Sequence, residues 1–309
     1  MSDFFLRFDI PKKTEFLINH SHRLTFLGSC FSNEISNYAS QAGFHALSNP
    51  FGTIYHPYPI AKNILDALNG NATFTFLKRD DLMYSWDAST KVNGKTEEEL
   101  KIIINNLNEE LIEQLMQPGF LFITFGSAFI YKLKSENRYV ANCHKQPGIL
   151  FDKEITSEDS TYALWRETLT KLWQLNPDLR VIFTVSPVRH IRDGLIENNH
   201  SKARLIRVIE QLAATLKVDY FPSYEIMIDE LRDYRFYKED RVHPSAEAIQ
   251  YIWNQFSDLY FDVQTKNNIQ EILKIRKRLG HRSNTESSLD LNLVKSMEQM
   301  KEKFPWINW

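Results

Sequence analysis

The sequence predicts an α/β fold in which helices cover both faces of a mainly parallel sheet. Apolar runs of strand length recur along the chain, amphipathic segments of helix length separate them, and turn signals divide the two. A parallel pair of strands needs a helix-length crossover, and strands buried on both faces are apolar almost throughout. The alternation therefore predicts a parallel sheet between two layers of helices.

Four apolar runs are the expected strands of this sheet. The clearest are FLFITFG at residues 120–126 and RVIFTV at residues 180–185, which are apolar at most positions. Shorter runs lie at residues 24–27, directly before Gly28, and at residues 218–221. Continuous apolar runs of this length are typical of strands in the middle of a parallel sheet.

Helical spacing marks the segments that connect these strands. The strongest pattern covers residues 96–116, where Thr96 and Glu99 form a capping box and Pro118 follows the end. One apolar stripe runs along this segment and consists of Leu100, Ile103, Ile104, Leu107, Leu111 and Leu115. Further helices are expected at residues 33–41, 58–68, 161–175, 198–217 and 245–260.

Composition and charge exclude several classes of protein. The 309 residues are 43% hydrophobic with a formal net charge of −2, which argues against a disordered chain and against a general binder of nucleic acid or membranes. No apolar stretch reaches the roughly 18 residues of a membrane span, and the N-terminus lacks the pattern of a secretory signal. We expect a cytoplasmic protein with Cys30 and Cys143 reduced, one disulfide between them being the alternative.

The character of the chain changes after residue 262, where it becomes polar and basic. We therefore expect a main domain at residues 1–262 and a helical extension at residues 263–309. Because amphipathic spacing and aromatic residues mark this extension, it is expected to form a homodimer contact or to cover the rim of the active site.

The segment Gly28-Ser29-Cys30-Phe31-Ser32 joins the first expected strand to the first helix. Ligands of open parallel sheets bind outside the carboxyl ends of the strands, where amides at a helix N-terminus stabilise negative charge. Ser29 is therefore a candidate nucleophile, although a Gly-Ser pair here also fits a turn and a helix N-cap. Cys30 at the same helix end is an alternative nucleophile or a small buried thiol.

The segment Asp240-Arg241-Val242-His243-Pro244-Ser245 precedes the last helix of the main domain. A carboxylate that binds Nδ1 of an imidazole fixes its tautomer and leaves Nε2 to take a proton from a nucleophile. Asp240 and His243 are therefore a candidate dyad, although His-Pro-Ser is also an ordinary start of a helix. Together with Ser29 they form a possible Ser-His-Asp set, which can occur in any chain order.

These residues also carry a resemblance to a known family. GSCFS at residues 28–32 resembles the signature of the GSCFA family, a branch of the SGNH/GDSL-like hydrolase superfamily. The resemblance continues through five ordered blocks at residues 49–57, 124–131, 140–147, 184–203 and 220–245. It implies a three-layer α/β/α sandwich around a mainly parallel five-stranded sheet.

The same resemblance assigns roles to individual residues. It implies that Ser29 is the nucleophile, that Asp240 and His243 complete the triad, and that the backbone N–H groups of Ser29 and Gly52 form the oxyanion hole. The superfamily usually places an asparagine donor in its third block, Gly-x-Asn-Asp, whereas this chain has Gly126-Ser127-Ala128-Phe129. Ser127 and Asn142 are the alternative donors. We expect His190, Asn49 and His144 to contact the substrate.

The expected function is a serine-dependent esterase or deacylase that acts on a small O-acyl ester and needs no metal or organic cofactor. An acetylated carbohydrate is the substrate that the resemblance suggests, so we expect a small-molecule or glycan partner and neither nucleic acid nor a membrane. Two alternatives stay open: an acyl-group transferase on the same scaffold, and a non-catalytic protein that recognises carbohydrate.

Overall fold

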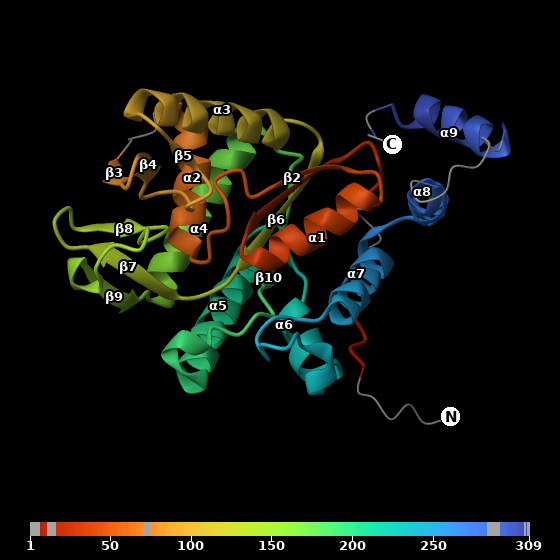
Figure 1. Cartoon of the computed structure of the whole chain (residues 1–309). Coiled ribbons are helices and arrows are strands. Elements are labelled where there is room, and N and C mark those ends of the chain that lie inside the picture. Colours follow the sequence, from red (N-terminus) through yellow and green to blue (C-terminus); the bar gives the residue numbers. More distant parts are fainter. Residues whose placement is uncertain (1–6, 11–16, 71–74, 283–290, 306, 308–309) are drawn as a thin grey trace.

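The computed structural model describes residues 7–10, 17–70, 75–282, 291–305 and 307, and it has the expected α/β architecture (Figure 1). Its central sheet is parallel, with strand order β11-β10-β6-β1-β2. The strands are β1 (Arg23–Gly28), β2 (His45–Ser48), β6 (Gly119–Phe125), β10 (Arg180–Val185) and β11 (Val218–Tyr220). The fold class and the five-stranded sheet are therefore confirmed.

The middle strand, β6, shows why the sheet needs helices on both faces. All seven of its residues are buried, and its side chains alternate between two apolar clusters. Leu121, Ile123 and Phe125 belong to the first cluster, whereas Phe120 and Phe122 belong to the second. Four helices complete the first cluster, α2 (Pro57–Asn69), α3 (Glu97–Leu115), α4 (Glu158–Leu175) and α5 (Leu195–Thr215), and two complete the second, α1 (Cys30–Gln41) and α7 (Ala246–Tyr260).

The helices that cover the sheet follow the sequence pattern closely. They are α1 (Cys30–Gln41), α2 (Pro57–Asn69), α3 (Glu97–Leu115), α4 (Glu158–Leu175), α5 (Leu195–Thr215), a short α6 (Ser223–Glu225) and α7 (Ala246–Tyr260). Thr96 caps α3 as expected, since its hydroxyl accepts from the Glu99 N–H at 3.1 Å. In the part of the chain that the structure describes, no helix is long and apolar enough to cross a membrane.

Two small antiparallel sheets lie beside the helical layers and were not expected from the sequence (Figure 1). One consists of β3 (Phe76–Arg79), β4 (Leu82–Ser85) and β5 (Asn93–Gly94). The other consists of β7 (Phe129–Leu133), β8 (Arg138–Val140) and β9 (Phe151–Ile155). Because β7 begins four residues after the last residue of β6, the second sheet stands next to the carboxyl ends of the central strands.

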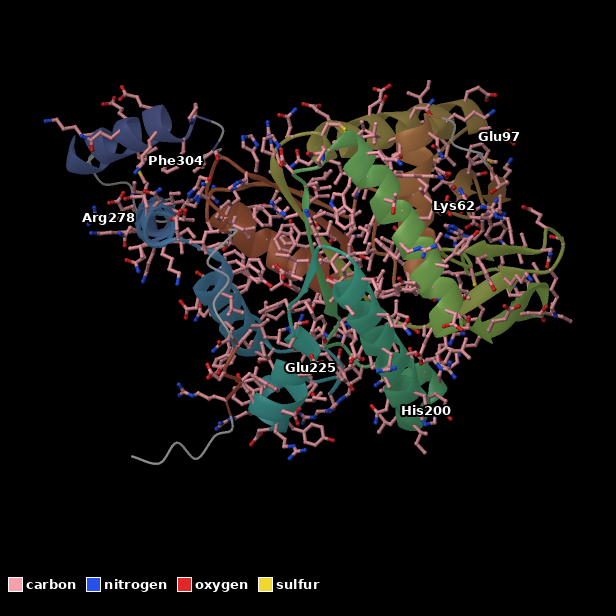
Figure 2. All side chains as sticks on the ribbon, turned by 180° about the vertical axis from the view of Figure 1, so that it is seen from behind. Lys62, Glu97, His200, Glu225, Arg278 and Phe304 are labelled. Atoms are coloured by element: carbon pink, nitrogen blue, oxygen red, sulfur yellow. The ribbon has the colours of Figure 1, made fainter. Side chains whose placement is uncertain are left out.

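The C-terminal extension packs at the end of the central sheet where its parallel strands begin. Helices α8 (Val263–Arg282) and α9 (Leu291–Lys303) form a small apolar cluster that contains Ile272 and Phe304. Phe304, labelled in Figure 2, lies 4.9 Å from the ring of His20, three residues before β1 begins. The extension therefore contacts the amino-terminal edge rather than the rim at the carboxyl ends. The homodimer stays a prediction, and Trp306 and Trp309 lie outside the described residues.

Candidate active site

Asp240 and His243 form a hydrogen-bonded pair in the loop before α7. The imidazole Nδ1 lies 2.7 Å from Asp240 Oδ2, and the backbone N–H groups of Val242 and His243 donate to Oδ1 at 2.8 and 2.9 Å. These two N–H groups, together with the imidazole, lower the pKa of Asp240 to about 2. The side chains of His243 and Asp240 are 42% and 48% exposed, so Nε2 is left to meet a substrate or nucleophile.

Backbone contacts hold this loop at the carboxyl edge of the sheet. The N–H of Arg189, four residues after the end of β10, donates to the Val242 carbonyl at 3.3 Å. Within the loop, the N–H of Lys238 donates to the His243 carbonyl at 2.7 Å. The Arg189 guanidinium lies 4.2 Å from the centre of the Tyr237 ring, which adds a cation–π contact. The Asp240–His243 pair is therefore anchored beside the end of β10.

Ser29 lies at the turn between β1 and α1 and has 0% exposure. Its hydroxyl accepts from the Phe31 N–H at 3.3 Å, which makes Ser29 the N-cap of α1. Its own N–H donates to the Thr124 carbonyl at 3.2 Å. The interpretation of Gly-Ser as a turn and N-cap is therefore confirmed, and the cap uses the Ser29 hydroxyl as an acceptor only, which leaves its O–H proton to donate.

Cys30 is the first residue of α1 and is partly exposed. Burial raises the pKa of its thiol, and Glu34 raises it further; the N–H groups of Cys30 and Phe31 and the charge of Lys202 act in the opposite direction. The Cys30 thiol in turn raises the pKa of Tyr55, whose main shift comes from burial. Cys30 is a free thiol, as is Cys143, so the disulfide alternative is not present.

No hydrogen bond joins Ser29 or Cys30 to His243 among the residues that the structure describes. The two segments are nevertheless linked, because Lys238 of the His243 loop forms an ion pair with Glu34 of α1 at 3.7 Å. His243 also contributes to the lowered pKa of His190. The first turn of α1, the loop after β10 and the loop before α7 therefore meet at one edge of the sheet.

Lys202 of α5 is a buried cation behind this edge, with 1% exposure. Its ammonium donates to the Gly126 carbonyl at 2.8 Å and to the Ser186 carbonyl at 2.7 Å. These carbonyls directly follow β6 and β10, so Lys202 ties together the ends of two neighbouring strands. Burial lowers the pKa of Lys202 to about 7.

A cavity of about 570 Å³ adjoins the site and is walled by the β7–β8–β9 sheet. Its lining includes Tyr55, Phe129, Asn142, His190 and Arg192. The His190 ring packs edge-on against Tyr55 at 5.2 Å, and its Nε2 is buried without a hydrogen-bond partner within the described residues. Burial and the charge of Lys202 lower the pKa of His190 to about 4, so its imidazole is neutral around pH 7.

The expected oxyanion donors lie in two places: Gly52 bonds to Asn49, and Ser127 and Asn142 line the cavity. The Gly52 N–H donates to the Asn49 carbonyl at 2.7 Å. The side-chain Oδ1 of Asn49 accepts the Gly28 N–H, also at 2.7 Å. Ser127 and Asn142 both line the cavity, where the Ser127 hydroxyl and the Asn142 amide oxygen accept backbone N–H groups. The NH₂ group of Asn142 has no hydrogen-bond partner among the described residues.

His144, which the sequence predicts to contact the substrate, is not part of the cavity lining, although Cys143 and Lys145 on either side of it are. It has 0% exposure, and its Nε2 bonds to the Ser85 carbonyl at 2.7 Å. The aromatic rings of Tyr84 and Trp86 pack against it. In the described part of the chain, no group of three or more His, Cys, Asp or Glu residues is arranged to hold a metal ion.

The sequence profile of the GSCFA family matches residues 23–256, which cover all five strands of the central sheet and both site segments. The chain belongs to the GSCFA family. No curated protein matches the sequence significantly.

Two residues of the site were missed by the sequence analysis of this GSCFA-family chain. Tyr55 and Lys202 both lie in the blocks that carry the resemblance, but neither was assigned a role. The sequence signal that could have found Lys202 is its helical spacing, which places this lysine on the buried face of α5 between Asn198 and Leu205.

Proposed function

We propose that this GSCFA-family chain is a hydrolase that cleaves a small O-acyl ester through a covalent acyl-enzyme. The observation that carries the proposal is the Asp240–His243 pair, in which the carboxylate binds Nδ1 of an imidazole whose side chain is 42% exposed, and in which Nε2 has no hydrogen-bond partner among the described residues. This is the arrangement that a general base needs for activating a hydroxyl or thiol. The nucleophile comes from the turn between β1 and α1, where the sequence predicts Ser29 and offers Cys30 as the alternative.

The steps of the reaction follow from these groups. His243 Nε2 takes the proton of the nucleophile as it attacks the ester carbonyl, and then gives that proton to the departing alkoxide. Asp240 remains ionised throughout because its pKa is about 2, so it stabilises the imidazolium that forms between the two events. Water then attacks the acyl-enzyme with His243 again as base.

The cavity beside the site supports a polar alcohol as the other half of the substrate. Its wall combines aromatic side chains with hydrogen-bonding groups, including Tyr131, Asn142, Gln146 and His190. Aromatic surfaces together with a few polar groups are suited to binding a sugar ring. An acetylated carbohydrate therefore fits the proposed site, with its acyl group toward the β1–α1 turn.

Hydrolysis of p-nitrophenyl acetate and of acetylated sugars tests this function. We expect His243→Gln to lower kcat/KM by about 10² to 10⁴-fold, the usual contribution of a general base. His200→Gln is the matched control, because His200 is exposed on α5 and is expected to leave kcat/KM unchanged (Figure 2). Ester turnover that His243→Gln does not alter, or none with the wild-type chain, would contradict the proposal; glycan binding without turnover would favour a recognition protein.

A further inference from the structure

We propose that the cavity beside the site binds an anionic group on the alcohol half of the ester, so that the substrate is an acylated acidic sugar rather than a neutral one. Arg192, Lys145 and Asn142 of the cavity wall form the anion subsite. The inference rests on the proposed function, because it assumes that the cavity holds the alcohol half of the ester that His243 helps to cleave.

The charged side chains of the cavity wall are mostly positive. Among the described lining residues they are Lys145, Lys153, Arg192 and Asp193. The carboxylate of Asp193 is already in use, because it forms an ion pair with Lys153, whose ammonium also lies 4.5 Å from the centre of the Phe129 ring. Lys145 and Arg192 have no ion-pair partner in the part of the chain that the structure describes. The wall therefore carries two cations whose charge no carboxylate balances.

The charge of Arg192 acts on a second segment of the wall. Arg192 belongs to a short 3₁₀ helix (Ile191–Asp193) between β10 and α5, whereas Cys143 belongs to the connection between β8 and β9. Burial raises the pKa of the Cys143 thiol to about 11, and the Arg192 guanidinium acts in the opposite direction. The Lys153–Asp193 ion pair joins the same 3₁₀ helix to β9. The cations from the two segments are therefore held beside one cavity.

The amide of Asn142 adds a neutral donor to these cations. Its Oδ1 accepts the His144 N–H at 2.8 Å, which fixes the orientation of the amide and leaves its NH₂ group without a partner among the described residues. An NH₂ group only donates hydrogen bonds, as do guanidinium and ammonium groups. A carboxylate or phosphate accepts several such bonds at once, and arginine binds either of them through two parallel N–H groups. The donor set of the subsite therefore matches an anion.

The turn that carries Lys145 is held in a strained backbone conformation. His144 and Lys145 have φ angles of +47° and +58°, in the left-handed region that residues other than glycine rarely adopt. Two contacts fix His144 there, because its Nε2 bonds to the Ser85 carbonyl at 2.7 Å and its own carbonyl accepts from Arg79 Nη1 at 2.8 Å. Strained backbone persists where the surrounding structure holds it. The buried His144 is therefore a positioning residue for Lys145 and Asn142.

His190 connects the anion subsite to the proposed base. It lines the cavity two residues before Arg192, and its Nε2 is buried without a hydrogen-bond partner within the described residues. Burial is the main cause that lowers the pKa of His190, and the charges of Asp193 and His243 also act on it, in opposite directions. The wall that carries the cations and the imidazole of His243 are therefore both near His190, within reach of one substrate.

The test compares two sugars of nearly the same shape, methyl glucuronoside and its neutral amide, by calorimetry with the full chain. We expect the acid to bind about 10 to 10²-fold more tightly, the usual range for hydrogen bonds to a charged group. Because Arg192 and Lys145 are exposed, about 0.5 M NaCl is expected to weaken binding of the acid and not of the amide. Mono-O-acetylated forms of both sugars are expected to show the same ratio in kcat/KM, through KM. Methyl glucoside 6-phosphate is the second arm, and the anion that binds more tightly identifies the group that the subsite accepts.

Arg192→Gln and Lys145→Gln each remove one cation from the anion subsite. Each is expected to weaken binding of the acidic sugar about tenfold and to bring it closer to that of the amide. Arg207→Gln is the matched control, because Arg207 is exposed on α5 outside the cavity lining and its loss changes the net charge equally. If neither anion binds the wild-type chain more tightly than the amide, or if Arg207→Gln weakens binding as much as the other two variants do, the inference is overturned and the proposed function stands. If the wild-type chain turns over no ester, the proposed function is overturned, whatever sugar the cavity binds.

Discussion

Replacing Lys202 with methionine tests whether burial lowers the pKa of the Lys202 amine behind the site. Burial lowers the pKa of Lys202 from an ordinary value of 10.5 to about 7, so between these pH values the unfolded chain holds a proton that the folded chain has released. The free energy of unfolding rises with pH wherever the unfolded state binds more protons. The contribution of Lys202 to stability is therefore fully present above pH 10.5 and is lost as the pH falls through about 7.

The two pKa values set the size of the effect. Each unit of difference corresponds to about 1.4 kcal/mol, so the wild-type chain is expected to gain about 3 kcal/mol from this one group between about pH 6 and about pH 9. Lys202→Met has no proton to exchange and lacks this gain. Its absolute stability is a weaker test, because it relieves the buried charge but leaves the Gly126 and Ser186 carbonyls without a donor, at about 1–3 kcal/mol each.

Urea unfolding of both chains across this pH range gives the measurement. The difference in unfolding free energy between wild type and Lys202→Met is expected to change by about 3 kcal/mol in favour of wild type as the pH rises. Lys171→Met is the control, because Lys171 is 42% exposed on α4 and is expected to give a difference that does not vary with pH. Parallel pH curves for wild type and Lys202→Met would refute the reasoning.

Three further substitutions test other parts of the site. Asp240→Asn removes the charge that stabilises the imidazolium, so kcat for p-nitrophenyl acetate is expected to fall by about 10²–10⁴-fold with an unchanged circular dichroism spectrum; a fall under threefold would contradict this role. His190→Asn removes a neutral imidazole from the cavity wall, so KM for an acetylated sugar is expected to rise while kcat changes little, and an equal loss in kcat with no change in KM would exclude a binding role. Gly52→Ala places a Cβ against the Ser89 hydroxyl at a φ of +76°, so thermal unfolding is expected to show a loss of about 1–3 kcal/mol, and an unchanged melting temperature would be inconsistent with the tight turn.

The sequence predicts the parts of the fold that depend on strong periodic patterns. The expected strand at residues 180–185 matches β10, and the expected strand at 120–126 differs from β6 by one residue at each end. The edge strand β2 gave no such pattern, because its four residues, His45–Ser48, are only half-buried and two of them are polar. The small sheets were missed for a related reason, since their short strands include charged residues such as Lys132 and Arg138.

The candidate site was also predicted only in part from the sequence. The spacing of Asp240 and His243 was enough to predict their pairing, because three residues of one loop bring both side chains together. The turn and N-cap at Ser29 were predicted as well, but the complete burial of its side chain was not, because burial there depends on segments that are far away in the sequence. Gly52 was expected as an oxyanion donor and Asn49 as a substrate contact, and both roles stay predictions. Asn49 Oδ1 accepts the Gly28 N–H at the carboxyl end of β1, and the Gly52 N–H donates to the Asn49 carbonyl.

The most direct measurement of the central claim is fluorophosphonate labelling of the folded chain, mapped by peptide mass spectrometry, with and without His243. We expect one adduct in the β1–α1 turn, at Ser29, and we expect His243→Gln to slow its formation at least about tenfold, because the imidazole takes the proton of the nucleophile. His200→Gln is the control, because His200 is exposed on α5 and is expected to leave the labelling rate unchanged. No adduct at this turn in the wild-type chain, or a labelling rate that does not depend on His243, would contradict an activated nucleophile at the β1–α1 turn.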